Sequence, residues 1–408
     1  TVHLSGVGCG QVQKGVTLIP FTGNLEYNVD KNSSTFLKET ATPGYYAHIL
    51  EKFGIFSQMS ATERAGVFRF KFPEDKGNIM IDLSQKLGDT RTHWSSIQKV
   101  SELEVEGYMH ETAFCANESG HEIYFSIRFN KPIVKALFFN KGEAQPNAVN
   151  EYWQGNVALG VSFETKDTLE ARIGISYTSV VNARINREKE LENKTFSQVK
   201  KEAQQKWNQE LSKIEVKGSS ADDQVIFYTG LYHSLIHPNI ISDVNGYYPT
   251  MGSREVKKSE FTRYTTFSLW DTYRNVHSLL TLVYPERQLD MVKSMIGMYK
   301  ESGWLPKWEH VSRETNNMNG DPAIPVIVET YLKGITRFDI QKAYEAITKQ
   351  ASDTTTGNRY RPGINNYIKS GYIPDDKKGN YFVYGSAATT LEYTYADWCI
   401  GMLAKKLG

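Results

Sequence analysis

The hydrophobic pattern of this chain changes near residue 185, and that change constrains the fold more than any other feature. Before it, short apolar runs of strand-type residues follow one another, as at 65–72 and 122–129. Most of these runs have no helix-length apolar period between them, and glycine-containing turn signals separate them. Repeated short strands of this kind favour an antiparallel β-sandwich over a parallel α/β sheet.

After a charged stretch that opens at residue 186, the apolar pattern becomes helical. The segment 224–235 carries its apolar residues on one face, and further helical stretches follow between loops that contain glycine and proline. Successive helices joined in this way favour a toroid of helical hairpins, and no strict repeat supports an α-solenoid. The predicted helical stretches beyond 235 are 279–282, 289–299, 324–332, 338–348 and 388–407.

A chain of 408 residues is too long for one ordinary compact domain. We therefore predict a β-sandwich domain over 1–185, a linker with helical character over 186–216, and a helical unit over 217–408. The fold class is thus multidomain β + α, with the sheet domain first. The helical unit would be the N-terminal part of a toroid.

Charge and motif content exclude several classes of function. Lys and Arg total 47 against 46 Asp and Glu, and no dense basic stretch is present, so a nucleic-acid partner is not expected. No apolar run is long enough to span a membrane. The three cysteines, Cys9, Cys115 and Cys399, match no metal-ligand spacing. Metalloprotease, phosphate-loop and nucleophile-elbow motifs are absent.

Aromatic residues make up 12% of the chain, and one segment combines them with charge. The segment SLWDTYR at 268–274 contains Trp270, Asp271 and Arg274. Helical spacing would place Trp270 beside Arg274 and Asp271 beside Arg274, as in a platform for a pyranose ring and its hydroxyls. A local Asp271–Arg274 ion pair with Trp270 in the core is the alternative.

A second polar and aromatic region covers 303–321. Trp304 and Trp308 flank a lysine and suit the rim of a binding cleft, or a loop packed across a helix end. Glu314 and Asp321 bound a stretch rich in asparagine. Its oxygens suit sugar hydroxyls or a hard cation such as calcium, although turn and N-cap roles explain the same residues.

Motifs in a fixed order resemble glycoside hydrolase family 92. In chain order they are HLSGVGC at 3–9, SLWDTYR at 268–274 with HSLLT at 277–281, GWLPKW at 303–308 with the acidic stretch to Asp321, and TLEY at 390–393 with Asp397-Trp398. The resemblance implies a β-sandwich followed by an (α/α)6 barrel. It also implies calcium-dependent, inverting removal of terminal α-mannose from α-mannoside oligosaccharides or N-glycans by a secreted, periplasmic or cell-surface enzyme.

The resemblance also implies roles for particular residues. The general acid of the family would lie five residues before the Thr of TLEY, and this position is Gly385 here. Glu392 is then the candidate to serve as the acid. The family's general base and calcium ligands would lie beyond Gly408, so we expect the chain to be a portion of a longer protein with an incomplete barrel. The residues that match substrate-binding positions are Trp270, Asp271, Arg274, Trp308, Glu314 and Asp321.

Gly385 leaves three interpretations open. Glu392 or another carboxylate replaces the acid, the protein binds mannan without cleaving it, or the substrate is a mannosyl phosphate, whose phosphate leaves without a proton. A glycoside phosphorylase of similar architecture is a further alternative. Linkage specificity and oligomeric state are not decided by the sequence.

Overall fold

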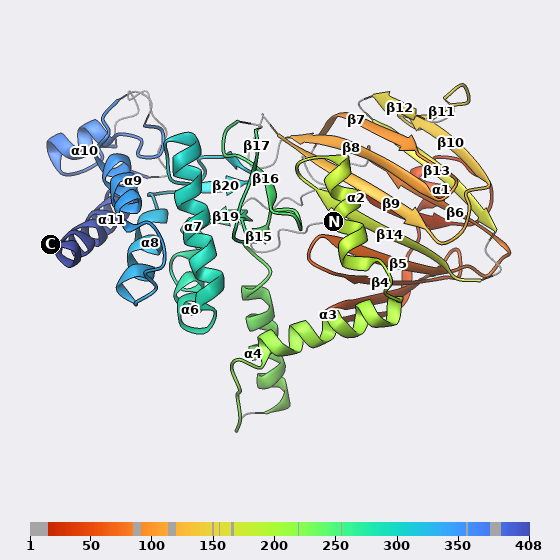
Figure 1. Ribbon diagram of the computed structural model, residues 1–408, viewed down its shortest axis with the longest axis horizontal. Helices are drawn as coiled ribbons and strands as arrows, with labels where there is room; N and C mark the ends of the chain where they lie inside the picture. The colour runs from red at the N-terminus through yellow and green to blue at the C-terminus, as the bar shows by residue number, and fades with distance from the viewer. Residues whose placement is uncertain are drawn as a thin grey trace. The chain divides into compact units, whose positions relative to one another are not determined.

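The computed structural model describes residues 15–84, 91–112, 120–148, 151–154, 156–164, 167–218, 220–253, 255–355, 358–375 and 385–408. The motif at 3–9, Cys9 and Cys115 lie outside these residues. The chain divides into two compact units. In Figure 1 the colour follows the residue number, from red at the N-terminus to blue at the C-terminus. We call Thr1–Gly218 with Asp243–Tyr247 the sandwich unit, and Ser219–Ser242 with Tyr248–Gly408 the helical unit.

Two antiparallel sheets of unequal width build the sandwich unit. The smaller has five strands in the order β1-β6-β13-β10-β11, and the larger has nine in the order β12-β7-β8-β9-β14-β5-β4-β3-β2. The strands are β1 Thr17–Phe21, β2 Phe36–Thr42, β3 Tyr45–Leu50, β4 Ile55–Ala61, β5 Ala65–Lys71, β6 Lys76–Asp82, β7 Arg91–Lys99, β8 Glu104–Thr112, β9 His121–Phe129, β10 Lys135–Asn140, β11 Glu143–Gln145, β12 Glu151–Gln154, β13 Val157–Glu164 and β14 Leu169–Ser176. The predicted antiparallel β architecture of the first part is confirmed.

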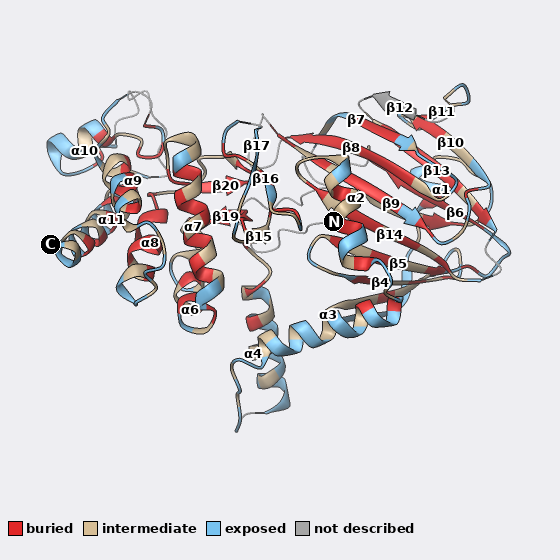
Figure 2. Ribbon diagram, viewed as in Figure 1, coloured by how far each residue is buried: buried red, intermediate tan, exposed pale blue. Residues whose placement is uncertain are grey.

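The core of the sandwich unit lies between its two sheets. Ile79 and Ile81 of β6 belong to the same buried cluster as Phe125 and Ile127 of β9. Met80, between the two isoleucines, belongs to a second cluster on the other face of the small sheet. This alternation is what a strand produces when successive side chains point to opposite faces. Figure 2 shows the resulting concentration of buried residues on these strands.

The described residues of this unit also form the helices α1 Val29–Asn32, α2 Val180–Leu191 and α3 Phe196–Leu211. Helix α2 packs on β14 and β9, and α3 packs on β3, β4 and β5. Gly174 in β14 makes the α2 contact possible, since a Cβ at this position would lie 2.1 Å from the Ala183 carbonyl oxygen. The region 186–216, predicted as a linker, therefore packs on the large sheet and belongs to the sandwich unit.

Among the described residues, the helical unit contains a helix at each stretch predicted from the apolar pattern, with bounds that differ by a few residues, and two short helices, at 269–272 and 364–370, that were not predicted. The described helices are α4 Ala221–Ser234, α5 Leu269–Thr272, α6 Val276–Val283, α7 Pro285–Ser302, α8 Ala323–Leu332, α9 Ile340–Ser352, α10 Ile364–Ser370 and α11 Ser386–Leu407. Neighbouring helices pack in pairs: α6 with α7, α7 with α8, α8 with α11, and α9 with both α7 and α11. Among the described residues, no helix combines the length and apolar character that crossing a membrane requires.

Short strands interrupt the helical unit, and the prediction that the chain is helical from about 220 is wrong over 239–268. The strands are β15 Asn239–Ile240, β16 Tyr247–Pro249, β17 Val256–Lys258, β18 Tyr264–Thr265, β19 Phe267–Ser268, β20 Trp308–His310 and β21 Arg313–Glu314. Each is two or three residues long, too short to produce a period in the sequence. Strands β19, β20 and β21 form a sheet that carries the start of the 268–274 motif.

Candidate functional site

The 268–274 motif begins on β19 and continues through the single turn of α5. Phe267 pairs with Glu309 and Ser268 with Trp308 across β19 and β20, which fixes where α5 begins. Asp271 lies in this turn, and its carboxylate accepts a hydrogen bond from the Ser268 hydroxyl. The start of the motif is therefore fixed by strand pairing with β20, and its turn is stabilised by the hydrogen bond from Ser268 to Asp271.

Glu392 of α11 joins the motif from a distant part of the chain. Its carboxylate accepts hydrogen bonds from Trp270 Nε1 at 3.2 Å, the Tyr273 hydroxyl at 2.8 Å and Arg274 Nη2 at 2.9 Å. The Arg274 guanidinium also lies 4.5 Å from the centroid of the Trp270 ring. The predicted closeness of Trp270 and Arg274 is present, but the carboxylate that pairs with Arg274 is Glu392 and not Asp271.

Gly320 allows Glu392 to come this close. A Cβ on Gly320 would lie 2.9 Å from the Glu392 Cβ, and Gly320 has a φ of +70°, a conformation that favours glycine. A side chain at 320 would displace α11 or the Glu392 carboxylate. Gly320 is thus part of the candidate site through its missing side chain.

The candidate site is half-exposed and of mixed charge. The Glu392 side chain retains 17% of its accessible surface and that of Arg274 retains 45%. Trp270, Asp271 and Tyr273 are also partly exposed. An indole, two carboxylates and a guanidinium that reach solvent together can contact both the apolar face and the hydroxyls of a sugar ring.

Trp308 and Glu314 occupy positions that favour the packed-loop alternative. Trp308 is fully buried, with 0% of its surface exposed. The Glu314 carboxylate accepts hydrogen bonds from the backbone N–H groups of Lys307, Trp308 and Asn316 at 2.8 to 2.9 Å. Glu314 therefore closes the loop between β20 and α8, and its contact with a substrate stays a prediction, as does that of Trp308.

A strained segment lies next to the motif and is held by Glu309. Thr266, Val311 and Ser312 have φ values of +64°, +47° and +59°, which side chains rarely adopt. The buried Glu309 carboxylate accepts hydrogen bonds from Thr266 N at 2.9 Å and from Ser312 N. Burial raises the pKa of Glu309 to about 7. No local sequence pattern indicates this role of Glu309, because the role depends on backbone conformation.

Asp321 is held by an arginine that sequence reasoning missed. Arg361 donates from Nε to Asp321 Oδ2 at 2.6 Å and pairs through Nη2 with Asp397 Oδ1 of α11 at 2.8 Å. Both Asp321 and Arg361 are fully buried as side chains. The guanidinium also lies 4.8 Å from the centroid of Tyr393, the residue after Glu392. This pair positions α11, so Asp321 supports the site, and its direct contact with a substrate stays a prediction.

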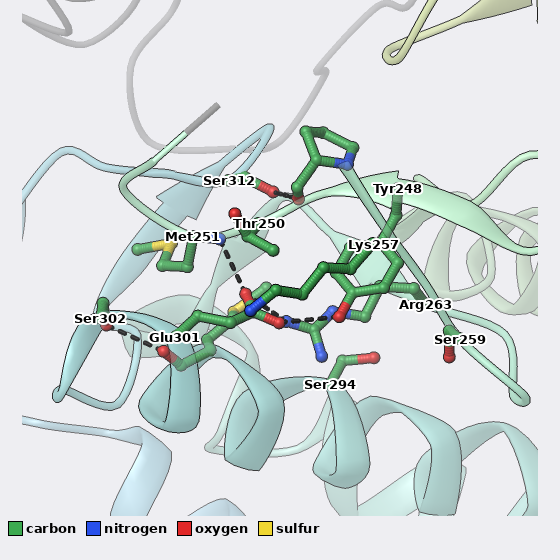
Figure 3. Close-up of polar contacts among 12 residues, drawn as sticks. Tyr248, Thr250, Met251, Lys257, Ser259, Arg263, Ser294, Glu301, Ser302 and Ser312 are labelled. Carbon is green, nitrogen blue, oxygen red and sulfur yellow. Dashed lines mark hydrogen bonds and ion pairs between the residues drawn. The ribbon is translucent and has the colours of Figure 1, made fainter. Parts of the chain in front are cut away.

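A second buried ion pair, between Arg263 and Glu301, holds the segment that precedes the 268–274 motif in the chain, as Figure 3 shows. Arg263 Nη2 lies 2.9 Å from both oxygens of Glu301 in α7, and the Tyr248 hydroxyl donates to the same carboxylate at 2.9 Å. Met251 N donates to it at 2.7 Å. Arg263 immediately precedes β18, so this pair fixes the strands before the motif against α7.

Gly385 is the N-cap of α11 and carries no group that could donate a proton. Its φ of +109° and ψ of 124° favour glycine over any residue with a side chain. Among the described residues, a Cβ there would meet the Ala388 Cβ alone, at 4.0 Å. It is therefore the backbone conformation of Gly385 that opposes a glutamate at this position.

No described group of three or more His, Cys, Asp and Glu side chains is arranged to hold a metal ion. Glu314, Asp321 and Asp397 are instead engaged by backbone N–H groups or by Arg361. These three carboxylates are therefore occupied by contacts within the chain, and the position of the family's calcium ligands stays a prediction.

The chain matches the glycosyl hydrolase family 92 N-terminal domain over 1–176 and the catalytic domain of the same family over 182–408. It belongs to glycosyl hydrolase family 92. A family GH92 α-mannosidase from Bacteroides thetaiotaomicron is 31% identical, with a TM-score of 0.88 over 96% of this chain and 54% of that one. The structure of that enzyme is also known in complex with mannoimidazole.

Two further proteins are similar to this chain. An inverting mannosidase of Bacteroides thetaiotaomicron is 27% identical, with a TM-score of 0.86 over 96% of this family 92 chain and 52% of its own. An uncharacterized secreted glycosidase of Arthroderma benhamiae is 26% identical over 459 residues, which cover all of this chain and 53% of the relative. The chain thus spans about half the length of the relatives that it matches.

Proposed function

We propose that the protein is an exo-acting glycosidase that removes terminal α-linked mannose from mannosides or N-glycans. Membership of family 92 and the similarity to α-mannosidases support this substrate class. The observation that carries the proposal is the convergence of Trp270, Tyr273 and Arg274 on Glu392. It builds a rigid, partly exposed surface of indole, carboxylate and guanidinium.

In this proposal Glu392 positions the sugar platform and does not act as the acid. Its partners Trp270 Nε1 and Arg274 Nη2 can only donate, so the Glu392 carboxylate is engaged in holding these two side chains. Trp270 would contact an apolar face of the mannose ring, and Asp271 and Arg274 its hydroxyls. Since both Trp270 and Arg274 bond to Glu392, their orientation is fixed before a sugar binds, which lowers the entropy lost on binding.

The proposed reaction also inverts the anomeric configuration and is assisted by calcium. In an inverting hydrolysis, a general acid protonates the leaving oxygen and a general base activates a water molecule. The two carboxyl groups lie roughly 6.5–9.5 Å apart. Calcium would supply charge stabilisation at the sugar hydroxyls when bound. We expect the base and the calcium ligands in parts of the protein outside the described residues, and we expect the protein to act outside the cytoplasm, as a secreted, periplasmic or cell-surface enzyme.

Gly385 favours a second candidate substrate, a mannosyl phosphate. The family resemblance assigns the general acid to this position, and the α11 N-terminus with its positive φ opposes a glutamate there. A phosphate leaves as an anion, so its departure needs no proton from an acid. A mannan-binding protein without turnover is the remaining alternative.

One experiment separates these functions. The intact natural protein is incubated with α-mannobioses of each linkage and with a mannosyl phosphodiester, and released mannose is measured with and without a chelator. Release from mannobioses supports the first proposal, and release only from the phosphodiester supports the second. Binding of methyl α-mannoside without turnover of any substrate indicates the non-catalytic alternative. Turnover that a chelator leaves unchanged contradicts the calcium requirement.

A further inference from the structure

The unequal width of the two sheets leaves a cavity in the sandwich unit. The small sheet ends at its edge strand β1, whereas the large sheet continues through β5, β4 and β3 to β2. A cavity of about 280 Å³ lies between β1, the region of α1 and the inward face of β3, β4 and β5. This cavity, which we call the sandwich cavity, belongs to none of the elements that carry the Trp270–Glu392 site.

One wall of the sandwich cavity is a continuous row across three strands. His48 of β3 pairs with Ser57 of β4, and Ser57 pairs with Phe70 of β5. In the next row Met59 pairs with Phe68. All five side chains line the cavity. The wall is therefore apolar except at the adjacent pair His48 and Ser57.

Both polar residues of this pair have an atom without a hydrogen-bond partner. Within the described part of the chain, neither Ser57 Oγ nor His48 Nδ1 bonds to the protein. Ser57 is fully buried, with 0% of its surface exposed. A buried polar atom left without a partner retains the cost of its desolvation, so native proteins seldom keep two side by side without something that bonds to them.

The other polar residues that line the cavity do not favour a charged ligand. No Lys or Arg is among the lining residues. The Asp82 carboxylate accepts hydrogen bonds from the Tyr27 hydroxyl at 2.9 Å and from Ser84 N at 2.7 Å. Burial lowers the pKa of His48, so its imidazole is neutral at pH 7 and a ring nitrogen can accept a hydrogen bond. A neutral ligand fits these surroundings.

We propose that the sandwich cavity binds a small neutral alcohol or phenol, with its hydroxyl between Ser57 and His48 and its apolar body against Met59, Phe68 and Phe70. A hydroxyl can accept from Ser57 Oγ and donate to His48 Nδ1 at once, and Cβ atoms of directly paired residues lie about 5 Å apart, which allows one oxygen to reach both. An apolar cavity of about 150 Å³ holds benzene, so the sandwich cavity has room for a ring with a substituent. The proposal does not depend on the mannosidase activity.

The test measures binding of phenol and cyclohexanol, with toluene and methyl α-mannoside as comparisons, by calorimetry on the 408-residue chain. Ser57→Leu places a bulky apolar side chain where the hydroxyl of the ligand would lie and should abolish binding of phenol. Ser57→Ala removes only the hydroxyl and should weaken phenol about fivefold while leaving toluene nearly unchanged. Ser60→Ala is the matched control, because Ser60 lies on the opposite face of the same strand and its hydroxyl donates to Gly44 O at 2.8 Å.

We expect phenol and cyclohexanol to bind the unaltered chain at least about tenfold more tightly than toluene, and Ser60→Ala to retain that preference. If Ser57→Leu fails to fold, Ser57→Ala tests the proposal instead, through the ratio of its affinity for phenol to its affinity for toluene. The proposal is overturned if no probe binds at about 10 mM, in which case water alone occupies the cavity. It is also overturned if toluene equals phenol, or if methyl α-mannoside binds and Ser57→Leu removes that binding.

Discussion

Glu392 and Gly320 illustrate how single residues build the candidate site. The Glu392 carboxylate accepts hydrogen bonds from Trp270, Tyr273 and Arg274. The missing side chain of Gly320 leaves the space that Glu392 occupies. Because the ring of Trp270 and the guanidinium of Arg274 stack 4.5 Å apart, they would move together if the carboxylate were lost. At this scale the site behaves as one unit and not as a set of independent contacts.

Replacing Glu392 by Gln tests this unit. The variant removes the charge that pairs with Arg274 and presents an N–H group to one of the three donors, so we expect kcat/KM of the intact protein to fall about 10- to 100-fold. Steady-state kinetics with the preferred substrate measures it, and thermal unfolding checks the fold. Glu215→Gln is the control, since Glu215 is an exposed carboxylate whose side chain keeps 71% of its surface. An unchanged kcat/KM would refute the positioning role.

His277 gives a prediction for pH. Burial lowers its pKa from 6.5 to about 4, and its Nδ1 lies 2.9 Å from Gln288 Oε1. Between these two pH values the unfolded chain binds a proton that the folded chain does not, so stability is lost as pH falls from 6.5 to about 4. The loss from this residue should reach about 3 kcal/mol.

His277→Asn keeps a donor for Gln288 and cannot titrate, so its unfolding free energy should depend less steeply on pH over that window, although the variant should be less stable at pH 7. Urea unfolding at several pH values measures this dependence. His233→Asn is the control, because His233 is exposed on α4. Equal slopes in the original chain and in His277→Asn would show that His277 does not contribute to the acid sensitivity.

At the scale of elements, α7 and the strands before the motif are joined by the Arg263–Glu301 pair, whose side chains retain 4% and 7% of their surface. Gly297 of α7 faces this arginine, and a Cβ there would fall 1.8 Å from Arg263 Nη1. The helix therefore carries a glycine in its interior, despite the poor helix propensity of glycine, because the guanidinium occupies the space.

Gly297→Ala should therefore destabilise the chain by about 3 kcal/mol, since it displaces one partner of a buried ion pair. The gain in helix propensity, at most about 1 kcal/mol, does not offset this loss. Gly230→Ala is the matched control in α4, where no described residue beyond the helix's own turn lies within 4 Å of the added Cβ, and it should stabilise the chain slightly. Urea unfolding measures both variants, and equal effects of the two would contradict the argument.

At the scale of the whole molecule, α11 exposes an apolar face. Leu391, Tyr395, Trp398 and Met402 retain 70%, 43%, 60% and 38% of their surface, and they recur at the spacing of one helical face. Helix α4 exposes Val225 and Ile226 to 65% and 70%. The relatives are about twice as long as this chain. We propose that further helices of a longer protein cover the α11 face, as in the predicted (α/α)6 toroid.

Trp398→Ser distinguishes a covered face from an exposed one. In the 408-residue chain the unfolding free energy should change by less than about 0.5 kcal/mol, because Trp398 is exposed. In the intact natural protein it should fall by about 3 kcal/mol, since burial of a tryptophan is lost. Lys405→Ser on the same helix should change neither. Equal effects of Trp398→Ser in both proteins would show that nothing covers this face.

The order of the two architectures and the family can both be inferred from the order of the residues alone. Strands with a period of two residues and helices with a period of 3.6 leave a signal in consecutive residues, and the 268–274 motif is likewise local. The two- and three-residue strands over 239–268 left no such signal, so they were missed.

The carboxylate that pairs with Arg274 could not be inferred in this way, because tertiary packing selects it. Glu392 and Arg361 act across 118 and 40 residues of chain, on Arg274 and Asp321 respectively. Likewise, the strain at Thr266 and Ser312 and the row of His48 and Ser57 arise from backbone conformation and strand register. Contacts between residues distant in sequence depend on how elements pack, and no local pattern encodes that packing.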